Sequence, residues 1–160
     1  MAPGASAIPA PTLPTLDSTQ RAADTGLAMS QDNVAVVERV WAAFNRRDAD
    51  EATELVSPDF SFRSEFGAFS GRGYEGRAGF RQYFRDMAET WSAFRMELDE
   101  VVKRGDVVIV TYREHAIGRT SGVEVEARGC EVWHFRDGQP VRAENYGSKE
   151  EGLASVGLRE

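Results

Sequence analysis

The chain has 160 residues, of which 41% are hydrophobic and 28% are charged, with a formal net charge of −7 and a single cysteine, Cys130. This length and balance are typical of one globular domain with a real core. The acidic charge argues against general nucleic-acid binding, although local arginines could still hold a small anion. One cysteine excludes an intramolecular disulfide.

The N-terminal residues 1–29 are rich in Ala, Pro and Thr. They have neither the basic start nor the continuous apolar stretch of a secretory signal, and no run in the chain approaches the ~20 apolar residues of a membrane span. We therefore expect a disordered tail before a domain of residues 30–160. The alternative is that the natural start is Met29. Together with the lone cysteine, these features predict a cytoplasmic protein without a membrane partner.

Three helices are predicted in the N-terminal half. The first is capped by Ser30 or Asp32 and ends near residues 45–48, and the second covers residues 50–56. The third covers residues 78–90. The first and third carry apolar stripes at helical spacing: Val34, Val37, Val40, Trp41 and Phe44, then Phe80, Tyr83, Phe84, Met87 and Trp91.

The remaining segments alternate as strands do, at residues 59–66, 94–102, 107–117, 123–136 and 141–146. A glycine-rich loop fills residues 67–79, and Ser148 with Glu151 forms the capping box of a short last helix. Short turns make the last four strands an antiparallel meander, and the helices must cover one face. The expected fold class is α+β: a cone-shaped barrel made of a strongly bent, mostly antiparallel sheet. The three helices of the N-terminal half lie on its concave face.

Several strings carry a family resemblance: residues 40–48 (VWAAFNRRD), 55–60 (LVSPDF), 121–125 (SGVEV), 132–138 (VWHFRDG) and 146–158. The chain resembles the nuclear transport factor 2-like superfamily over residues 33–158, most closely its SnoaL-like group, which is related in fold to ketosteroid isomerase and limonene epoxide hydrolase. The resemblance implies a homodimer. It leaves the activity open, because the superfamily includes isomerases, cyclases, hydrolases and non-catalytic binders.

The acid–base set of ketosteroid isomerase is only partly present when it is carried over by position. Its helix tyrosine falls at Val40, its basic aspartate at Ser64 and its second acid near Glu131. Only one of the three positions is an acid, so isomerisation by that mechanism is not expected. The Asp-Arg-Asp set of the epoxide hydrolase cannot be placed on this sequence.

Glu131 is the leading candidate for chemistry. Strand alternation places it on one face with Trp133 and Phe135. A carboxyl group among aromatic rings loses solvation, which raises its pKa and suits it to acid–base catalysis near neutral pH. The alternative is structural: Glu131 either pairs with Arg113 across the sheet or points outward.

Arg113, Asn145 and Tyr146 are the candidates for polarising a ligand oxygen beside Glu131. Alternation allows either Tyr112 with Glu114 or Arg113 with His115 to face the hollow, but not both pairs. The predicted pocket lining is Trp41, Phe44, Phe62, Ser64, Tyr83, Phe84, Trp91, Tyr112 and Trp133. So many aromatic side chains favour a small apolar ligand, or else plain core packing.

No metal or cofactor is expected, because the two histidines, His115 and His134, lack neighbouring ligands at metal-binding spacing. Cys130 is interpreted either as a buried apolar residue or as a nucleophile. The sequence therefore predicts a small-molecule pocket protein, an acid–base enzyme acting on a hydrophobic carbonyl compound. The alternatives are a non-catalytic binder and a dimerisation module that uses the sheet face of Cys130 and Val132.

Overall fold

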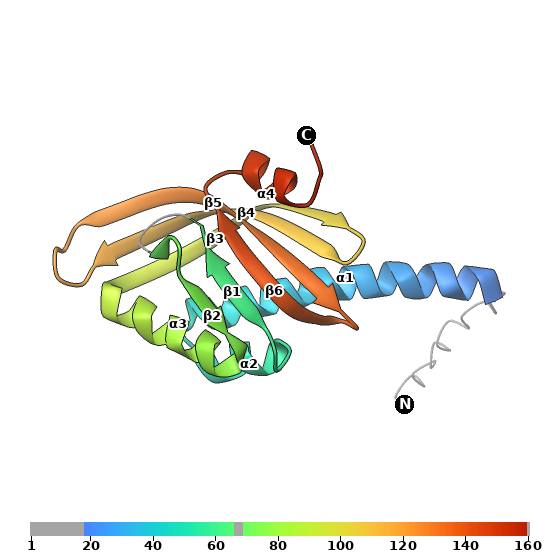
Figure 1. Cartoon of the computed structure of the whole chain (residues 1–160), viewed down its shortest axis with the longest axis horizontal. Helices are drawn as coiled ribbons and strands as arrows, with labels where there is room; N and C mark the ends of the chain where they lie inside the picture. Colours follow the sequence, from blue (N-terminus) through green and yellow to red (C-terminus); the bar gives the residue numbers. More distant parts are fainter. Residues whose placement is uncertain (1–17, 66–68, 160) are drawn as a thin grey trace, which may run out of the picture.

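The computed structural model describes residues 18–65 and 69–159, with side chains from Asp32 onward. Its elements, in chain order, are α1 (Ser18–Asn45), α2 (Ala49–Leu55), β1 (Ser61–Ser64), β2 (Gly73–Glu75), α3 (Gly76–Thr90), β3 (Trp91–Arg104), β4 (Val107–Gly118), β5 (Glu124–Arg136), β6 (Gln139–Tyr146) and α4 (Lys149–Ser155) (Figure 1). Within the described residues, no helix combines the length and the apolar character needed to cross a bilayer.

The strands form one bent sheet of six, in the order β2-β1-β6-β5-β4-β3. The long strands β3 to β6 are an antiparallel meander, as predicted. Strand β1 lies parallel to β6, with Ser64 opposite Asn145, and antiparallel to β2. The mostly antiparallel sheet of the predicted α+β cone is thus confirmed. The sheet does not close, because β2 and β3 remain as its two edges.

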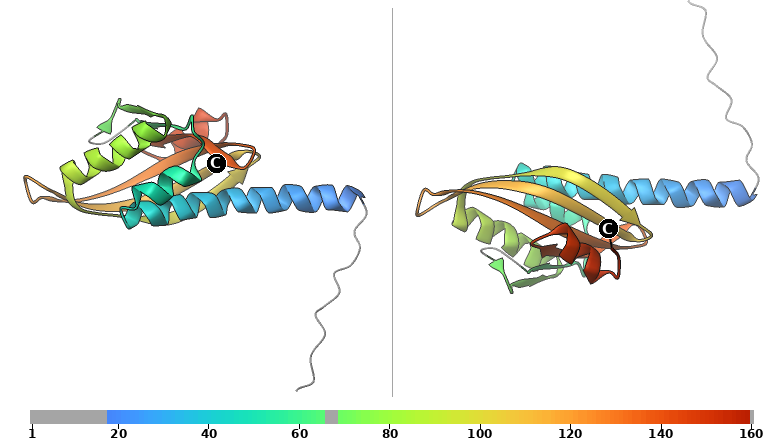
Figure 2. Two further views of the ribbon diagram at one scale, coloured as in Figure 1. Left: turned by 90° about the horizontal axis from the view of Figure 1, so that it is seen from below. Right: turned by 90° about the horizontal axis from the view of Figure 1, so that it is seen from above.

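Helices α1, α2 and α3 cover the concave face of the sheet, which confirms the predicted arrangement (Figures 1 and 2). Helical spacing brings the stripe residues of α1 and α3 onto this face, where Val37, Val40 and Trp41 pack with Phe80 and Tyr83 in the main core. The helical layer therefore places aromatic side chains directly opposite the inward residues of β4, β5 and β6.

A sharp turn joins α1 to α2. The Asp48 N–H donates to the Ala43 carbonyl at 2.8 Å and the Arg47 N–H to the Phe44 carbonyl at 3.0 Å, with Arg47 in the left-handed region at φ 61°. These bonds have the pattern of a Schellman motif. Asp48 then caps α2 by accepting the Glu51 N–H at 3.1 Å.

The side chain of Asn45 fixes the end of α1 against the edge strand β3. Its Nδ2 donates to the Met96 carbonyl and its Oδ1 accepts the Met96 N–H, both at 2.9 Å. The amide thus satisfies edge groups that no neighbouring strand reaches, and it sets the distance between α1 and the sheet.

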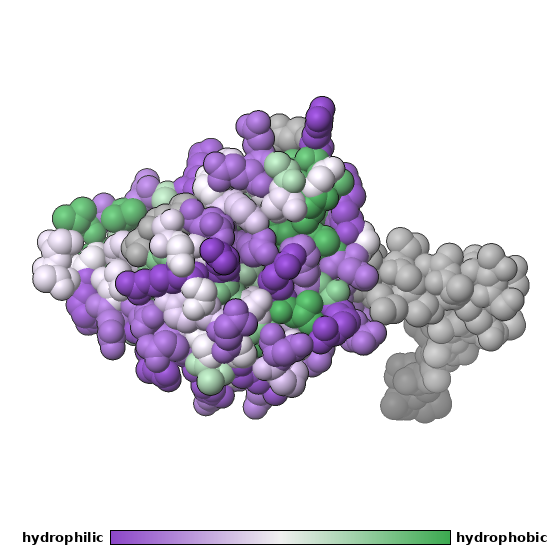
Figure 3. Space-filling model, viewed as in Figure 1, coloured by the Kyte–Doolittle hydropathy of each residue, from purple (hydrophilic) through white to green (hydrophobic). Residues whose placement is uncertain are grey.

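Helix α4 lies on the opposite, convex face, where its Leu153 packs against Cys130, Val132 and Ile109. The packing is close: a Cβ at Gly152 would lie 2.5 Å from the Cys130 sulfur. The expected free sheet face at Cys130 and Val132 is therefore wrong, because the last helix folds back over it. In Figure 3, which has the view of Figure 1, the surface is mostly hydrophilic, with a hydrophobic area next to α4.

Other boundaries also differ from the prediction. Helix α1 begins at Ser18, ahead of the expected cap at Ser30 or Asp32, because residues 18–29 contain many good helix formers. The expected tail of residues 1–29 lies partly outside the described residues. The glycine-rich loop contains a short strand, β2, which pairs with β1. The predicted capping box of α4 is confirmed: the Glu151 N–H donates to Ser148 Oγ at 3.2 Å.

Candidate functional site

The carboxyl group of Glu131 lies on the concave face of β5 and is only 5% exposed. Two indoles donate to the same oxygen, Oε1: that of Trp41 from α1 at 2.9 Å and that of Trp133, two residues along the strand, at 3.0 Å. Among the described residues, no hydrogen bond engages the second oxygen, Oε2. The carboxyl is thus held in one orientation with one oxygen left for a ligand.

Burial raises the pKa of the Glu131 carboxyl to about 7, against the two indole hydrogen bonds, which favour the ionised form. The negative charge of Glu114 adds a smaller upward shift. Near neutral pH, Glu131 therefore exists in both protonation states, which is what an acid–base group requires.

A second polar pair lies beside Glu131. Asn145 of β6 is opposite Glu131 in the sheet register, and its Oδ1 accepts a hydrogen bond from the Tyr112 hydroxyl at 2.6 Å. Burial raises the pKa of Tyr112, so its phenol stays a proton donor. The Tyr112 ring also meets the Trp41 ring edge to face, with centroids 5.1 Å apart.

The space beside Glu131 is much smaller than the predicted hollow. The cavity lined by Glu131 measures about 20 Å³, room for about one water molecule. Neighbouring rings occupy the rest. The Phe44 ring stacks on that of Tyr83 with centroids 5.7 Å apart, and the Phe62 and Tyr83 centroids are 4.5 Å apart. Most of the concave face is therefore packed core around the Glu131 carboxyl.

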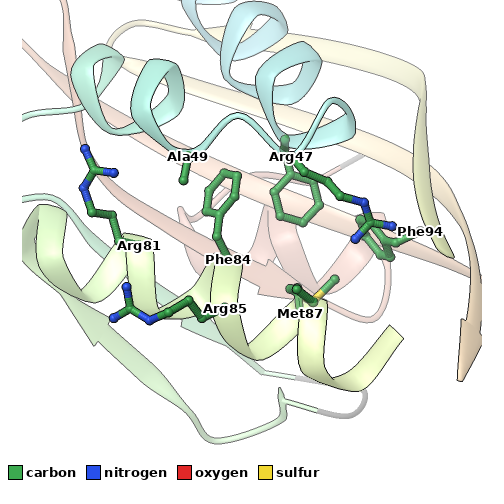
Figure 4. A pocket seen from close by; sticks show the side chains of 9 residues that line it. Arg47, Ala49, Arg81, Phe84, Arg85, Met87 and Phe94 are labelled. Atoms are coloured by element: carbon green, nitrogen blue, oxygen red, sulfur yellow. The ribbon is translucent and has the colours of Figure 1, made fainter. Parts of the chain in front are cut away.

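A larger groove lies on the outer side of the helical layer, between the α1–α2 turn, α3 and the start of β3. Its volume is about 220 Å³. The side chains that line it are Phe44, Arg47, Ala49, Arg81, Phe84, Arg85, Met87, Ala88 and Phe94 (Figure 4). Phe44 lines both the groove and the Glu131 cavity, so its ring separates the two spaces.

Comparison with known proteins identifies the family of this chain. The profile of the SnoaL-like domain matches residues 37–143. This protein belongs to the SnoaL-like family. No curated protein is similar to it at a significant level.

Solved structures share the fold at low sequence identity. A proposed polyketide cyclase from Xanthomonas campestris is 25% identical, with 80% of this chain and 98% of that chain covered and a TM-score of 0.62. A proposed SnoaL-like polyketide cyclase from Jannaschia sp. CCS1 is 19% identical, with 74% and 86% covered and a TM-score of 0.66. A protein with a ketosteroid isomerase-like fold from Catenulispora acidiphila is 14% identical, with 78% and 93% covered and a TM-score of 0.64.

Most of the predicted lining of this SnoaL-like chain is placed at the site. Trp41, Phe44, Phe62, Tyr83 and Trp133 line the Glu131 cavity. Phe84 lines the groove instead. Ser64 and Tyr112 are buried behind the cavity, and Trp91 is partly buried against the core, outside both linings.

Two of the predicted polarising residues lie away from Glu131. Arg113 is exposed on the convex face, because it is out of phase with the inward Tyr112. Tyr146 packs in the cluster under α4, and its hydroxyl donates to Glu144. Both assignments are wrong for the same reason. Each residue directly follows one that faces the helices, so its own side chain points to the other face of the sheet. Asn145 is the predicted partner that does lie beside Glu131.

The sequence analysis offered Tyr112 with Glu114 as one of two pairs that could face the hollow, but did not choose Glu114 as a site residue, and it missed the groove arginines. Glu114 is half-buried on the Tyr112 side of β4, and burial raises its pKa. Alternation from Tyr112 was the available signal for Glu114. For Arg81 and Arg85, the signal was their four-residue spacing around Phe84 on α3.

The histidines and the cysteine lie outside the cavity. His134 Nε2 lies 3.1 Å from the Arg142 guanidinium, and the half-buried His115 contacts Glu126 at 3.1 Å. Burial raises the pKa of Cys130 to about 12, which makes its thiol a weak nucleophile and favours the apolar interpretation. In the part of the chain that the structure describes, no three His, Cys, Asp or Glu side chains gather into a metal-binding cluster.

Proposed function

We propose that this SnoaL-like chain is a small-molecule pocket protein in which Glu131 acts as the acid–base group on a small hydrophobic carbonyl compound. The observation that carries the proposal is the buried carboxyl, fixed by two indoles at one oxygen and with a pKa raised to about 7. A carboxyl fixed in this way is preorganised for proton transfer, because little reorganisation is needed at the moment of reaction.

In the proposed reaction, ionised Glu131 removes a proton from the carbon next to the carbonyl group, through Oε2. The C–H electron pair moves into the enolate, and the proton on Oε2 is later returned to a carbon of the same molecule. Asn145 supports this step: its Oδ1 accepts from Tyr112, and among the described residues no hydrogen bond uses its side-chain N–H groups, which can therefore polarise the carbonyl oxygen.

Access to Glu131 sets a condition on the ligand. A cavity of about 20 Å³ admits about one water molecule, so a ligand reaches the carboxyl only when neighbouring rings move. Phe44 is the ring to consider first, because it is half-buried and lies between this cavity and the groove of about 220 Å³.

Proton exchange tests the proposal without knowledge of the natural substrate. The protein is incubated with 2-tetralone in D₂O, and deuterium incorporation next to the carbonyl is followed by NMR. We expect exchange above the buffer rate in the wild type, with an apparent pKa near 7, and at least a hundredfold loss in Glu131→Gln. Arg113→Gln is the matched control on the exposed face and should exchange like the wild type. Equal exchange in Glu131→Gln and the wild type would exclude Glu131 as the base.

A binding protein without catalysis is the second candidate. The observation that favours it is the size difference between the two spaces: the groove has room for a ligand, whereas the Glu131 cavity does not. Thermal-shift hits that are never converted or deuterated would support the binder.

The homodimer implied by the family resemblance stays a prediction. Because α4 covers Cys130 and Val132, a second copy could not bind at these two residues while α4 stays in place. Light scattering coupled to size-exclusion chromatography distinguishes a dimer from a monomer.

A further inference from the structure

The groove between α1, α2 and α3 has a charge that differs from that of the chain as a whole. Of the nine residues that line it, three are arginines and none is acidic, although the chain carries a net charge of −7 (Figure 4). Arg81 and Arg85 extend from α3 on one side, and Arg47 extends from the α1–α2 turn on the other. The groove is therefore a local positive site on an acidic protein.

The arginines are largely free to bind an anion. Among the described residues, neither Arg47 nor Arg85 forms a salt bridge, and Arg85 donates only to the neutral Gln82 amide. Arg81 contacts Asp50 at 2.5 Å, but the Asp50 side chain is 82% exposed, so this pair is weak and replaceable.

The backbone at Arg47 provides an independent observation. Arg47 occupies the left-handed position of the Schellman motif, at φ 61°, where glycine is the favoured residue. A side chain at this position strains the backbone. From this position the Arg47 side chain extends toward Phe94, at the end of the groove opposite Arg81 and Arg85 (Figure 4).

The floor of the groove is aromatic. Phe44 meets Phe84 and Phe94 edge to face, with centroids 5.2 Å and 5.0 Å apart. A volume of about 220 Å³ suits a molecule with one aromatic ring and a short polar chain, since benzene fits an apolar cavity of about 150 Å³. Guanidinium groups above such a floor complement a planar carboxylate attached to a ring.

We infer that the groove binds a small aromatic acid, with its carboxylate paired to Arg47 beside Phe94 and its ring against Phe44 and Phe84, while Arg81 and Arg85 add positive charge from the opposite end. This inference rests on the proposed function in one respect: the acid is the substrate class whose carbonyl group reaches Glu131 when Phe44 moves. The binding step itself depends only on the groove.

A matched pair of probes tests the carboxylate. The aryl keto acid 4-oxo-4-phenylbutanoate and its neutral amide, 4-oxo-4-phenylbutanamide, are titrated into the full-length protein by calorimetry. We expect the acid to bind about tenfold more tightly than the amide, because charge-assisted hydrogen bonds are roughly twice as strong as neutral ones. Raising the salt concentration should weaken only the acid. Equal affinities for the two probes, or no binding of the acid, would overturn the inference.

Three variants test the arginines. Arg47→Gly removes the charge while relieving the strained backbone, so it should fold at least as well as the wild type and bind the acid about fivefold more weakly. Asp50→Asn frees Arg81 from its competing carboxylate, so the acid should bind about twofold more tightly. Arg128→Gln, an exposed arginine on β5, changes the net charge by the same amount as Arg47→Gly and should leave the affinity unchanged. Equal weakening in Arg47→Gly and Arg128→Gln would show a general charge effect and contradict a site in the groove.

Glu131→Gln separates this inference from the proposed function. It should bind the keto acid like the wild type and fail to exchange its α-protons in D₂O. Binding without exchange in both proteins would sink the proposed function and leave the groove site standing. Exchange in the wild type, together with equal affinity for the acid and the amide, would contradict the groove site and leave the proposed function in place.

Discussion

The Glu131 cavity and the arginine groove are neighbours that share the wall formed by Phe44, yet they differ in almost every physical respect. Glu131 is 5% exposed, is held by two indoles and has about 20 Å³ of free space. The groove is open and positively charged, with about 220 Å³. The cavity contains an acid–base group but is too small for a ligand, whereas the groove is large enough for a ligand but has no acid–base group. A ligand that used both would be bound by charge outside and would react inside.

The largest expected effect is on the free energy of unfolding and comes from the buried Glu131 carboxyl. Burial raises the pKa of this carboxyl from 4.5 to about 7, so the folded protein holds the proton more tightly than the unfolded chain does. Wild-type stability should therefore fall as pH rises from 4.5 to 7, by about 3 kcal/mol, and stay at the lower level above that range. Glu131→Gln keeps an oxygen for both indoles and should not show this loss. Urea denaturation of both proteins at pH 5 and pH 8 measures the difference, and parallel pH profiles would refute it.

Trp41→Phe should have the next largest effect. It removes one of the two hydrogen bonds to Glu131 Oε1, and at pH 8 the carboxyl is ionised, so we expect a loss of about 2 kcal/mol. At pH 5 the carboxyl is neutral, and the loss should be smaller. Trp91→Phe is the control, since Trp91 packs against the same core without a hydrogen bond to Glu131. A loss that is equal at both pH values would indicate packing alone.

Arg47→Gly should change stability in the opposite direction. Glycine relieves the left-handed backbone, while the lost cation weakens the interaction with the C-terminal end of α1, so a net gain of about 0.5 kcal/mol is expected. Thermal unfolding at pH 7 measures it. A large destabilisation would mean that the side chain serves the helix end rather than the groove.

Asp50→Asn should have the smallest effect on stability, within about 0.5 kcal/mol, because the Arg81–Asp50 pair is exposed. The same variant should nevertheless bind an aromatic acid more tightly than the wild type. A change in affinity without a change in stability, measured on one preparation, would sharpen the contrast between the groove and the Glu131 cavity.

Periodicity in the sequence was enough to predict the helical layer, the four-strand meander and the face that Glu131 shares with Trp133 and Phe135. Each of these depends on an apolar pattern of 3.6 or 2 residues that local sequence carries directly. The same alternation contained the signal that Arg113 and Tyr146 face away, because each follows an inward residue by one. Choosing them as partners for Glu131 ignored the constraint that adjacent strand residues occupy opposite faces.

Other features depend on contacts between distant segments. The parallel pairing of β1 with β6 joins residues about eighty positions apart, and the cover that α4 places over Cys130 depends on where the chain folds back after β6. The free volume was also unpredictable from the sequence, because it depends on how the rings of Phe44, Phe62 and Tyr83 interlock.

By itself, the sequence determined that this protein is an α+β cone of the SnoaL-like type, with Glu131 on the same strand face as Trp133 and Phe135. Only the tertiary structure decided that rings fill most of the concave face, that two indoles hold Glu131, and that three arginines line a groove next to it. The physical reason is that periodicity specifies which face a side chain occupies, whereas packing between elements specifies how much space remains and which side chains meet.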